Sequence, residues 1–407
     1  MKRLPIHASL SFMVVALLIP VTLLLVSSGR EAGARDDASP HAAWENGPPT
    51  DPSFFPIGVW CQDPARAEAY RALGINTFVA LWEGPTEKDL EMLRKAGMRT
   101  ICDQNEVGLK HLHDPTIIGW MHGDEPDNYQ DDGKGGYGPA IPASRIVADY
   151  NTWRKKDPTR PVLLNLGIGV ADDVSKGTYV AMSEYPEYLR GCDIISFDIY
   201  PVVSFRKPNS EDFLYYVPKG VDRLVRWGKG KQIVWNIIEC THISNPDKMA
   251  TPEQVKATAW MSIIHGSMGI VYFVHQFKPV ADEAALLSDP KMMAAVKAIN
   301  EQILSLAPVL NSPTLADGGS STPDNPVVPV DVMVKQQGDA LYMLAVGMRN
   351  APTHATLTFD PLHRARQDAT VEVVGENRTL SLWGGHVEDD FRPYDVHIYK
   401  VTIPPGK

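Results

Sequence analysis

Two glutamates follow short apolar runs and could act together on one substrate. Glu125 comes shortly after the run at 117–122, and Glu239 comes directly after the run at 232–238. In a barrel of parallel strands, a carboxyl group just past the C-terminal end of a strand lies at the mouth of the active site. Two carboxyl groups facing each other there can cleave a glycosidic bond, one as proton donor and the other as nucleophile.

The neighbours of each glutamate agree with a position at a strand end. Pro126 directly follows Glu125 and disfavours helical geometry at that residue. Glu239 ends an apolar stretch, where a charged side chain is costly unless it is paired or functional. Two alternatives stay open at this point: Glu125 as a solvated loop acid, and Glu239 as half of a buried ion pair. Because the two glutamates are far apart in sequence, only tertiary structure can bring them together.

Further polar and aromatic side chains come at or just past predicted strand ends. Such residues can hydrogen bond to sugar hydroxyls or stack on a sugar ring. The predicted substrate-binding residues are Asp103, Asp124, Asn165, Asp198, Tyr200 and His275 for hydroxyl contacts, and Trp82 as a stacking platform. Trp120 and Trp235 lie within apolar runs and are predicted to be core residues. No His-Glu-x-x-His spacing occurs, and neither a metal nor another cofactor is predicted.

Strand-like and helix-like stretches alternate from residue 55 onwards, which is typical of a parallel sheet. The predicted strands cover residues 55–60, 75–81, 98–103, 117–122, 161–165, 193–197, 232–238 and 269–274. Eight such repeats predict a (β/α)₈ TIM barrel over residues 54–308. An open doubly wound sheet is the alternative. That fold usually carries a glycine-rich phosphate loop after its first strand, whereas Cys61-Gln62-Asp63-Pro64 stands there in this chain.

The composition changes after the predicted barrel. Residues 309–326 are rich in Pro, Gly, Ser and Asp and are predicted to be a linker. Short alternating stretches then follow at 327–334, 341–346, 355–359, 370–374 and 396–403. They predict an antiparallel β-sandwich domain over residues 327–407.

The N-terminus has the layout of an export signal. Lys2 and Arg3 precede an apolar run at 11–26, and Ala32-Gly33-Ala34 resembles a cleavage site. Residues 1–34 are therefore predicted to be a signal peptide, with an uncleaved N-terminal membrane anchor as the alternative. Residues 35–53 are predicted to be a flexible leader. These features predict a secreted or periplasmic protein.

The net charge limits the classes of molecule that the protein is expected to bind. The formal net charge of −10 argues against nucleic acid or an anionic membrane surface and is compatible with a neutral carbohydrate substrate. The possible N-terminal anchor is the one predicted membrane contact.

The four cysteines match no metal site and no dense disulfide framework, so they are predicted to be mainly small core residues.

These features together resemble clan A of the retaining glycoside hydrolases, across residues 55–308. Members of this clan carry one catalytic glutamate after the fourth barrel strand and another after the seventh, so the resemblance implies that Glu125 is the acid/base and Glu239 the nucleophile. The stretch 391–399 is similar to the closing strand of the β-sandwich appended to many such enzymes. Clan members usually have Asn before the acid/base, whereas this chain has Asp124. An aspartate cannot donate an amide hydrogen, which leaves the subfamily and the sugar open.

Two other functions remain possible at this level. The first is a carbohydrate-binding barrel protein without catalytic activity. The second is a metal-assisted hydrolase with Asp124, His122 and Asp198 as ligands.

Overall fold

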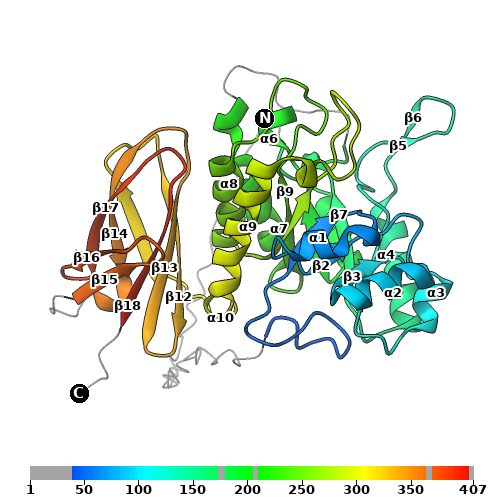
Figure 1. Ribbon diagram of the computed structural model, residues 1–407, viewed down its shortest axis with the longest axis horizontal. Helices are drawn as coiled ribbons and strands as arrows, with labels where there is room; N and C mark the ends of the chain where they lie inside the picture. The colour runs from blue at the N-terminus through cyan, green and yellow to red at the C-terminus, as the bar shows by residue number, and fades with distance from the viewer. Residues whose placement is uncertain (1–38, 173–178, 205–209, 364–368, 403–407) are drawn as a thin grey trace, which may run out of the picture. The chain divides into compact units, whose positions relative to one another are not determined.

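The computed structural model describes residues 39–172, 179–204, 210–363 and 369–402 (Figure 1). The predicted signal segment, residues 1–34, lies outside the described residues. Among the residues that are described, no helix is both long and apolar enough to cross a bilayer.

Eight parallel strands close into a barrel, which confirms the predicted TIM-barrel fold. The barrel strands are β1 (Ile57–Trp60), β2 (Thr77–Val79), β3 (Arg99–Cys102), β4 (Ile117–Met121), β7 (Val162–Leu166), β8 (Ile194–Phe197), β9 (Ile233–Glu239) and β10 (Ser267–Phe273). Their order around the barrel is β1-β10-β9-β8-β7-β4-β3-β2. The closing pair, β1 with β10, rules out the open doubly wound sheet.

The strands form from short apolar runs because both of their faces are covered. Side chains that include Trp60, Ile101, Leu163 and Trp235 fill one cluster of the core, and helices cover the outer face of the sheet (Figure 1). Trp120 and Trp235 are fully buried, as predicted.

Helices follow most of the barrel strands. The longer ones are α2 (Glu87–Ala96), α4 (Ala143–Lys156), α7 (Tyr216–Gly228), α8 (Pro252–Ile264) and α9 (Pro290–Ser305), and the shorter ones are α1 (Ala67–Arg71), α3 (Glu106–Lys110), α5 (Tyr185–Tyr188), α6 (Pro201–Ser204) and α10 (Ala307–Leu310). Helix α2 begins with a capping box in which Thr86 and Asp89 satisfy each other's backbone N–H groups. Thr251 and Gln254 form the same kind of capping box at the start of α8.

A buried ion pair fixes the start of β7 against β4. Arg160 is fully buried, and its guanidinium donates to Asp157 Oδ2 at 3.0 Å and to the carbonyl oxygen of Ile117 at 2.7 Å. Trp120 Nε1 donates to the same Asp157 oxygen at 2.9 Å. These contacts satisfy charges that would otherwise be costly to bury, and they hold in place the strand that leads to Glu125.

The predicted flexible leader is wrong for its described part, residues 39–53. Trp44 is 9% exposed and belongs to the same core cluster as Trp60 and Trp235. Asn46 hydrogen bonds through both its backbone N–H and its side chain to Thr159. The apolar area of Trp44 is large enough to hold this segment against the barrel in spite of its polar, proline-rich composition.

The C-terminal part is an antiparallel β-sandwich, as predicted. Its strands are β11 (Gly319–Pro323), β12 (Val330–Gln337), β13 (Ala340–Gly347), β14 (Thr353–Phe359), β15 (Ala369–Val373), β16 (Arg378–Leu382), β17 (His386–Phe391) and β18 (Val396–Thr402). They form one sheet in the order β11-β14-β17 and another in the order β12-β13-β18-β15-β16. The predicted linker at 309–326 is therefore wrong at β11, which pairs along its whole length with β14.

The four cysteines have no disulfide partner. Cys102, Cys192 and Cys240 are buried and Cys61 is half-buried, which agrees with the prediction of small core residues.

Candidate active site

A cavity of about 320 Å³ lies where the barrel strands end, and its lining is aromatic with two carboxyl groups. The lining residues are Trp60, Cys61, Ala80, Trp82, Asp103, Met121, His122, Gly123, Asp124, Phe273, His275 and Phe277. Trp82 and Phe277 are each 55% exposed, so their rings are available to a ligand. Four of the predicted substrate-binding residues, Trp82, Asp103, Asp124 and His275, therefore line one cavity. Phe273 and Phe277 were not predicted.

Glu125 lies four residues beyond the end of β4, in a conformation that the sequence did not indicate. Its φ is +41°, in the left-handed region that a residue with a Cβ seldom adopts. Asn128 Nδ2 donates to Glu125 Oε2 at 3.2 Å. A Cβ on Gly167 would lie 2.9 Å from Glu125 Oε1, so the absent side chain of Gly167 makes room for this carboxyl group.

Asp124 is held by a chain of side chains from two neighbouring strands. Asn165 Nδ2 donates to Asp124 Oδ1 at 2.8 Å, and Ser196 Oγ donates to Asn165 Oδ1 at 2.7 Å. Asn165 in β7 and Ser196 in β8 are paired in register. Desolvation, together with the charge of Glu125, raises the pKa of Asp124 to about 6, although the hydrogen bond from Asn165 opposes the shift. Asn165 thus orients an acid of the site, and Ser196 is a supporting residue that the sequence analysis missed.

Asp198, just past β8, completes a group of three neighbouring acids. Desolvation raises the pKa of Asp198 well above its usual range, and the charges of Glu125 and Asp124 add to the shift. Three negative charges at one place are unfavourable, so a proton on one of these acids lowers the energy of the others. Asp198 Oδ1 and Tyr200 Oη are buried, and the side chains of Tyr200 and Glu125 interact directly with the Asp198 carboxyl group.

Glu239 ends β9 and is 2% exposed. The backbone N–H of Val202 donates to Glu239 Oε1 at 2.8 Å, and that of Val203 donates to Oε2 at 3.3 Å. Desolvation raises the pKa of Glu239 to about 8 in spite of these two N–H groups. The groups that shift the pKa of Asp198 include Glu125 and Asp124, whereas those that shift the pKa of Glu239 include neither. Glu125 therefore interacts with Asp124 and Asp198. Glu239 instead accepts hydrogen bonds from Val202 and Val203 in α6.

Asp127 supports the loop that carries Glu125. It is fully buried, and its two carboxyl oxygens accept from the backbone N–H of Gly167 and from Tyr185 Oη, each at 2.9 Å. Burial raises the pKa of Asp127 to about 7. Asp127 was not among the predicted site residues. Its position two residues after Glu125, with a proline between them, was the available signal.

We predict that Asp127→Asn lowers kcat about 100-fold, the size of loss expected when reacting groups are displaced by about 1 Å. An asparagine can accept one of the two hydrogen bonds, but its NH₂ group would face the other donor. Turnover of a chromogenic glycoside gives the effect on kcat and KM separately. Asp131→Asn, at the exposed position of β5 (Gln130–Asp131), is the control. Equal kcat for Asp127→Asn and the wild type would show that Asp127 does not position Glu125.

The metal-assisted alternative requires Asp124, His122 and Asp198 to converge. Within the described ranges, no three His, Cys, Asp or Glu side chains are placed to hold an ion. His122 Nε2 lies 2.8 Å from the carbonyl oxygen of Gly191, where it can act only as a donor. The donor set that this alternative needs is therefore not formed.

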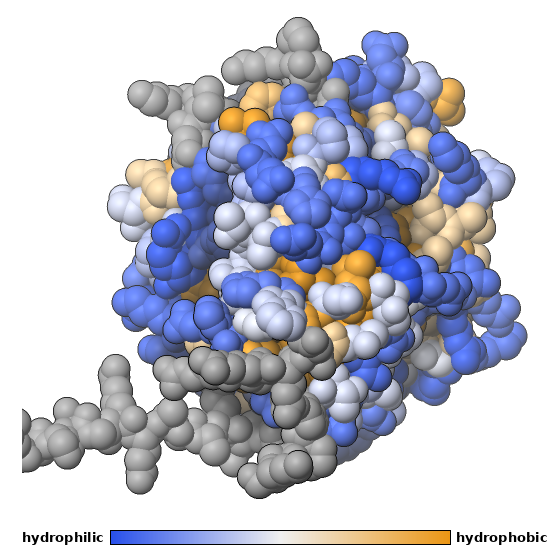
Figure 2. All heavy atoms as spheres, turned by 90° about the vertical axis from the view of Figure 1, so that its left-hand side faces the viewer, coloured by the Kyte–Doolittle hydropathy of each residue, from blue (hydrophilic) through white to orange (hydrophobic). Residues whose placement is uncertain are grey.

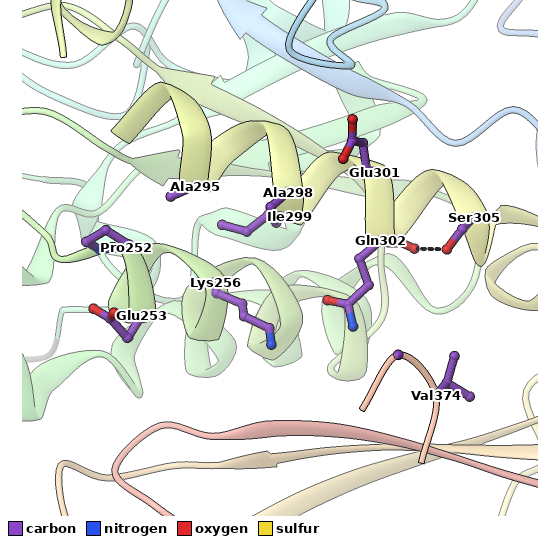
Figure 3. A pocket seen from close by; sticks show the side chains of 11 residues that line it. Pro252, Glu253, Lys256, Ala295, Ala298, Ile299, Glu301, Gln302, Ser305 and Val374 are labelled. Carbon is purple, nitrogen blue, oxygen red and sulfur yellow. Dashed lines mark hydrogen bonds between the residues drawn. The ribbon is translucent and has the colours of Figure 1, made fainter. Parts of the chain in front are cut away.

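A second cavity, of about 570 Å³, lies between α8, α9 and the turn at Val374–Gly375 (Figure 3). Its wall consists of small aliphatic side chains and long polar ones such as Lys256 and Gln302. It contains no aromatic residue and no strand-end acid, so it does not compete with the barrel cavity as a candidate active site.

Two solved structures share the fold at low sequence identity. AmyP, in a complex with maltotriose, is 11% identical with a TM-score of 0.51, and the match covers 87% of this chain and 98% of AmyP. Gan42B, a β-galactosidase of family GH42 from G. stearothermophilus, is 8% identical with a TM-score of 0.52, and the match covers 86% of this chain and 98% of Gan42B. No family model and no curated protein sequence matches. At these identities the two structures show that the fold is shared.

Proposed function

We propose that the protein is a glycoside hydrolase that acts on a neutral oligo- or polysaccharide. One observation carries the proposal: an aromatic cavity at the C-terminal end of the barrel strands adjoins a group of acids that includes Asp124, Glu125 and Asp198. Aromatic faces suit the apolar faces of a sugar ring, and carboxyl groups suit its hydroxyls and its glycosidic oxygen. The fold, which is shared with a β-galactosidase, agrees with this function.

The mechanism that we propose retains the configuration at the anomeric carbon. Glu125 gives a proton to the glycosidic oxygen while a carboxylate oxygen of Glu239 attacks the anomeric carbon and forms a glycosyl ester. The leaving sugar departs as an alcohol. Glu125, now ionised, takes a proton from a water molecule that attacks the same carbon and releases Glu239.

The test is a panel of neutral chromogenic glycosides and soluble polysaccharides, assayed with the full chain. We expect release of aglycone or new reducing ends from at least one member, with the first-formed sugar keeping the anomeric configuration of the substrate in NMR spectra. Binding of an oligosaccharide with no product on prolonged incubation would instead support the non-catalytic carbohydrate-binding alternative. Inversion at the anomeric carbon would contradict the retaining mechanism but not the hydrolase.

A further inference from the structure

The edge of the β-sandwich carries an exposed tryptophan that the proposed active site does not use. Trp383 is 72% exposed, although tryptophan is on average a largely buried residue. It borders a groove of about 600 Å³ lined by Thr356, Leu380, Ser381, Trp383, His386 and Glu388. We refer to these six residues as the sandwich groove. Figure 2 views the molecule from the side of β14, β16 and β17, and hydrophobic residues reach the surface near the middle of this largely hydrophilic face.

The indole is presented by a fixed turn. The backbone N–H and C=O groups of Trp383 pair with those of His386, both at 2.9 Å. The two residues between them, Gly384 and Gly385, have φ values of +55° and +86°, as a tight two-residue hairpin turn requires. The N–H of Phe359 donates to the carbonyl oxygen of Gly385 at 2.8 Å and ties the turn to β14. A ligand therefore meets a preorganised ring, with little loss of entropy on binding.

Short polar side chains lie beside the indole in rows across the sheet. Thr356 is the cross-strand partner of Glu388 and also of Thr322, and Thr358 is the partner of His386 and of Ser320. Alternate residues of a strand share one face, and neighbouring strands are about 4.8 Å apart. Hydroxyl and carboxyl groups are thus repeated at a spacing that suits the hydroxyls along a sugar chain. Thr358 Oγ1 also lies 2.9 Å from His386 Nδ1 and orients that ring.

The charge of the sandwich groove argues against anionic ligands. Among the residues that the structure describes, its lining holds no Lys or Arg, and Glu388 adds a negative charge. A phosphate or an acidic polysaccharide would be repelled. Leu380 is the aliphatic residue of the lining, and one leucine beside one tryptophan is a small apolar area for a stable protein partner. An exposed ring with flanking hydroxyl partners suits a pyranose, whose C–H groups pack on the negative face of an indole.

We propose that the sandwich groove is a second carbohydrate-binding site, which takes a neutral polysaccharide chain by stacking one sugar ring on Trp383. The choice of ligand class rests on the proposed function, but the site is separate from the barrel cavity. Its role is to hold the enzyme on a polymeric substrate while the barrel acts on another part of that substrate. Linking two sites in this way strengthens binding of a polymer far more than binding of a short sugar.

The test is affinity electrophoresis of the full chain in gels that contain soluble starch, galactan or xyloglucan, with polygalacturonate as the anionic comparison. We expect retardation by at least one neutral polymer, and a dissociation constant about tenfold larger for Trp383→Ala. Trp383→Phe should keep part of the retardation. Val327→Ala, which shortens another side chain of the same module that is 73% exposed, should match the wild type. Hydrolysis of a small chromogenic glycoside should be equal in all four proteins.

Three results would overturn the proposal: no retardation of the wild type by any neutral polymer, equal retardation of wild type and Trp383→Ala, or dimerisation in sedimentation experiments that disappears in Trp383→Ala. The last result would identify the groove as a contact between copies of the chain. Retardation of Glu125→Gln separates the two claims, because that variant should lose cleavage and keep binding. Failure to cleave any glycoside would therefore contradict the proposed activity of the barrel. Failure to be retarded would contradict the proposed binding site in the sandwich groove.

Discussion

Glu125→Gln is expected to lower kcat by about 10²–10⁴-fold, the usual contribution of a general acid–base group. Glutamine keeps the size of the side chain and can still meet Asn128, but it has no proton to give to the leaving oxygen. Glycosides with good leaving groups need little protonation, so their first step should be the least affected. The measurement is steady-state kinetics on a series of aryl glycosides whose leaving groups differ in pKa.

The control for this substitution is Glu106→Gln. Glu106 pairs with Lys110 on α3, and its side chain is 86% exposed, so its removal should leave kcat unchanged. A second measurement is the pH profile, which reflects the pKa values of the neighbouring acids. Because the charge of Glu125 raises the pKa of Asp198 and of Asp124, the neutral glutamine should lower both pKa values. Wild-type rates in Glu125→Gln, with an unchanged pH profile, would remove this residue from the mechanism.

The barrel could be predicted from sequence because its strands are buried on both faces. Such strands are continuous apolar runs, and each of the eight predicted runs overlaps an observed strand. Polar residues directly after these runs, such as Asp103, Asp198 and His275, could be proposed as site residues for the same reason. A position directly after an apolar run places a residue near a strand end, but it does not indicate where the side chain points.

The contacts that organise the site could not be predicted because they join loops that are distant in sequence. Nothing near Asp127 indicates that Gly167 and Tyr185 will donate to its two oxygens. The left-handed φ of Glu125 could not be predicted either, because Pro126 favours an extended conformation at the preceding residue. The loop is held by its tertiary contacts against the preference of its own sequence, as is common at functional sites.

In the sandwich, the sequence analysis missed the strands β11, β16 and β17. In β17, Asp389 points inward and is 8% exposed. Arg378 donates to its two oxygens at 2.8 and 2.7 Å, and Tyr399 Oη donates at 2.8 Å. A charge in an inward position breaks the apolar alternation by which a strand is recognised. Strand β11 was missed because glycine, serine and proline indicate a loop, although an edge strand tolerates them.

Glu239→Gln should also reduce kcat, by at least as much as Glu125→Gln, because an amide cannot form the glycosyl ester. The pH dependence of the wild type gives a further prediction. A nucleophile must be ionised, and the pKa of Glu239 is raised to about 8. The value of kcat/KM should therefore increase with pH up to about pH 8. Glu239→Gly in the presence of azide should recover turnover and yield a glycosyl azide.

The same carboxyl group predicts a change in stability that does not depend on activity. In the unfolded chain Glu239 has its ordinary pKa of 4.5, whereas in the folded protein the pKa is about 8. Between these two values the folded state binds more protons than the unfolded state, so the free energy of unfolding should fall as pH rises from 4.5 to 8. Glutamine resembles the protonated acid and cannot ionise. The melting temperature of Glu239→Gln should therefore decrease less over this range than that of the wild type.

Asp198 is the residue that could replace Glu239 in this role, because it is a buried acid just past a barrel strand and its pKa responds to the charge of Glu125. Asp198→Asn and Glu239→Gln should accordingly be compared on one substrate. If Glu239 is the nucleophile, only the glycine variant at 239 forms the azide product, and Asp198→Asn alters the pH profile while keeping measurable turnover. Full turnover in Glu239→Gln, with azide rescue of Asp198→Gly, would assign the nucleophile to Asp198. Glu239 would then be a structural acid that joins β9 to the first residues of α6.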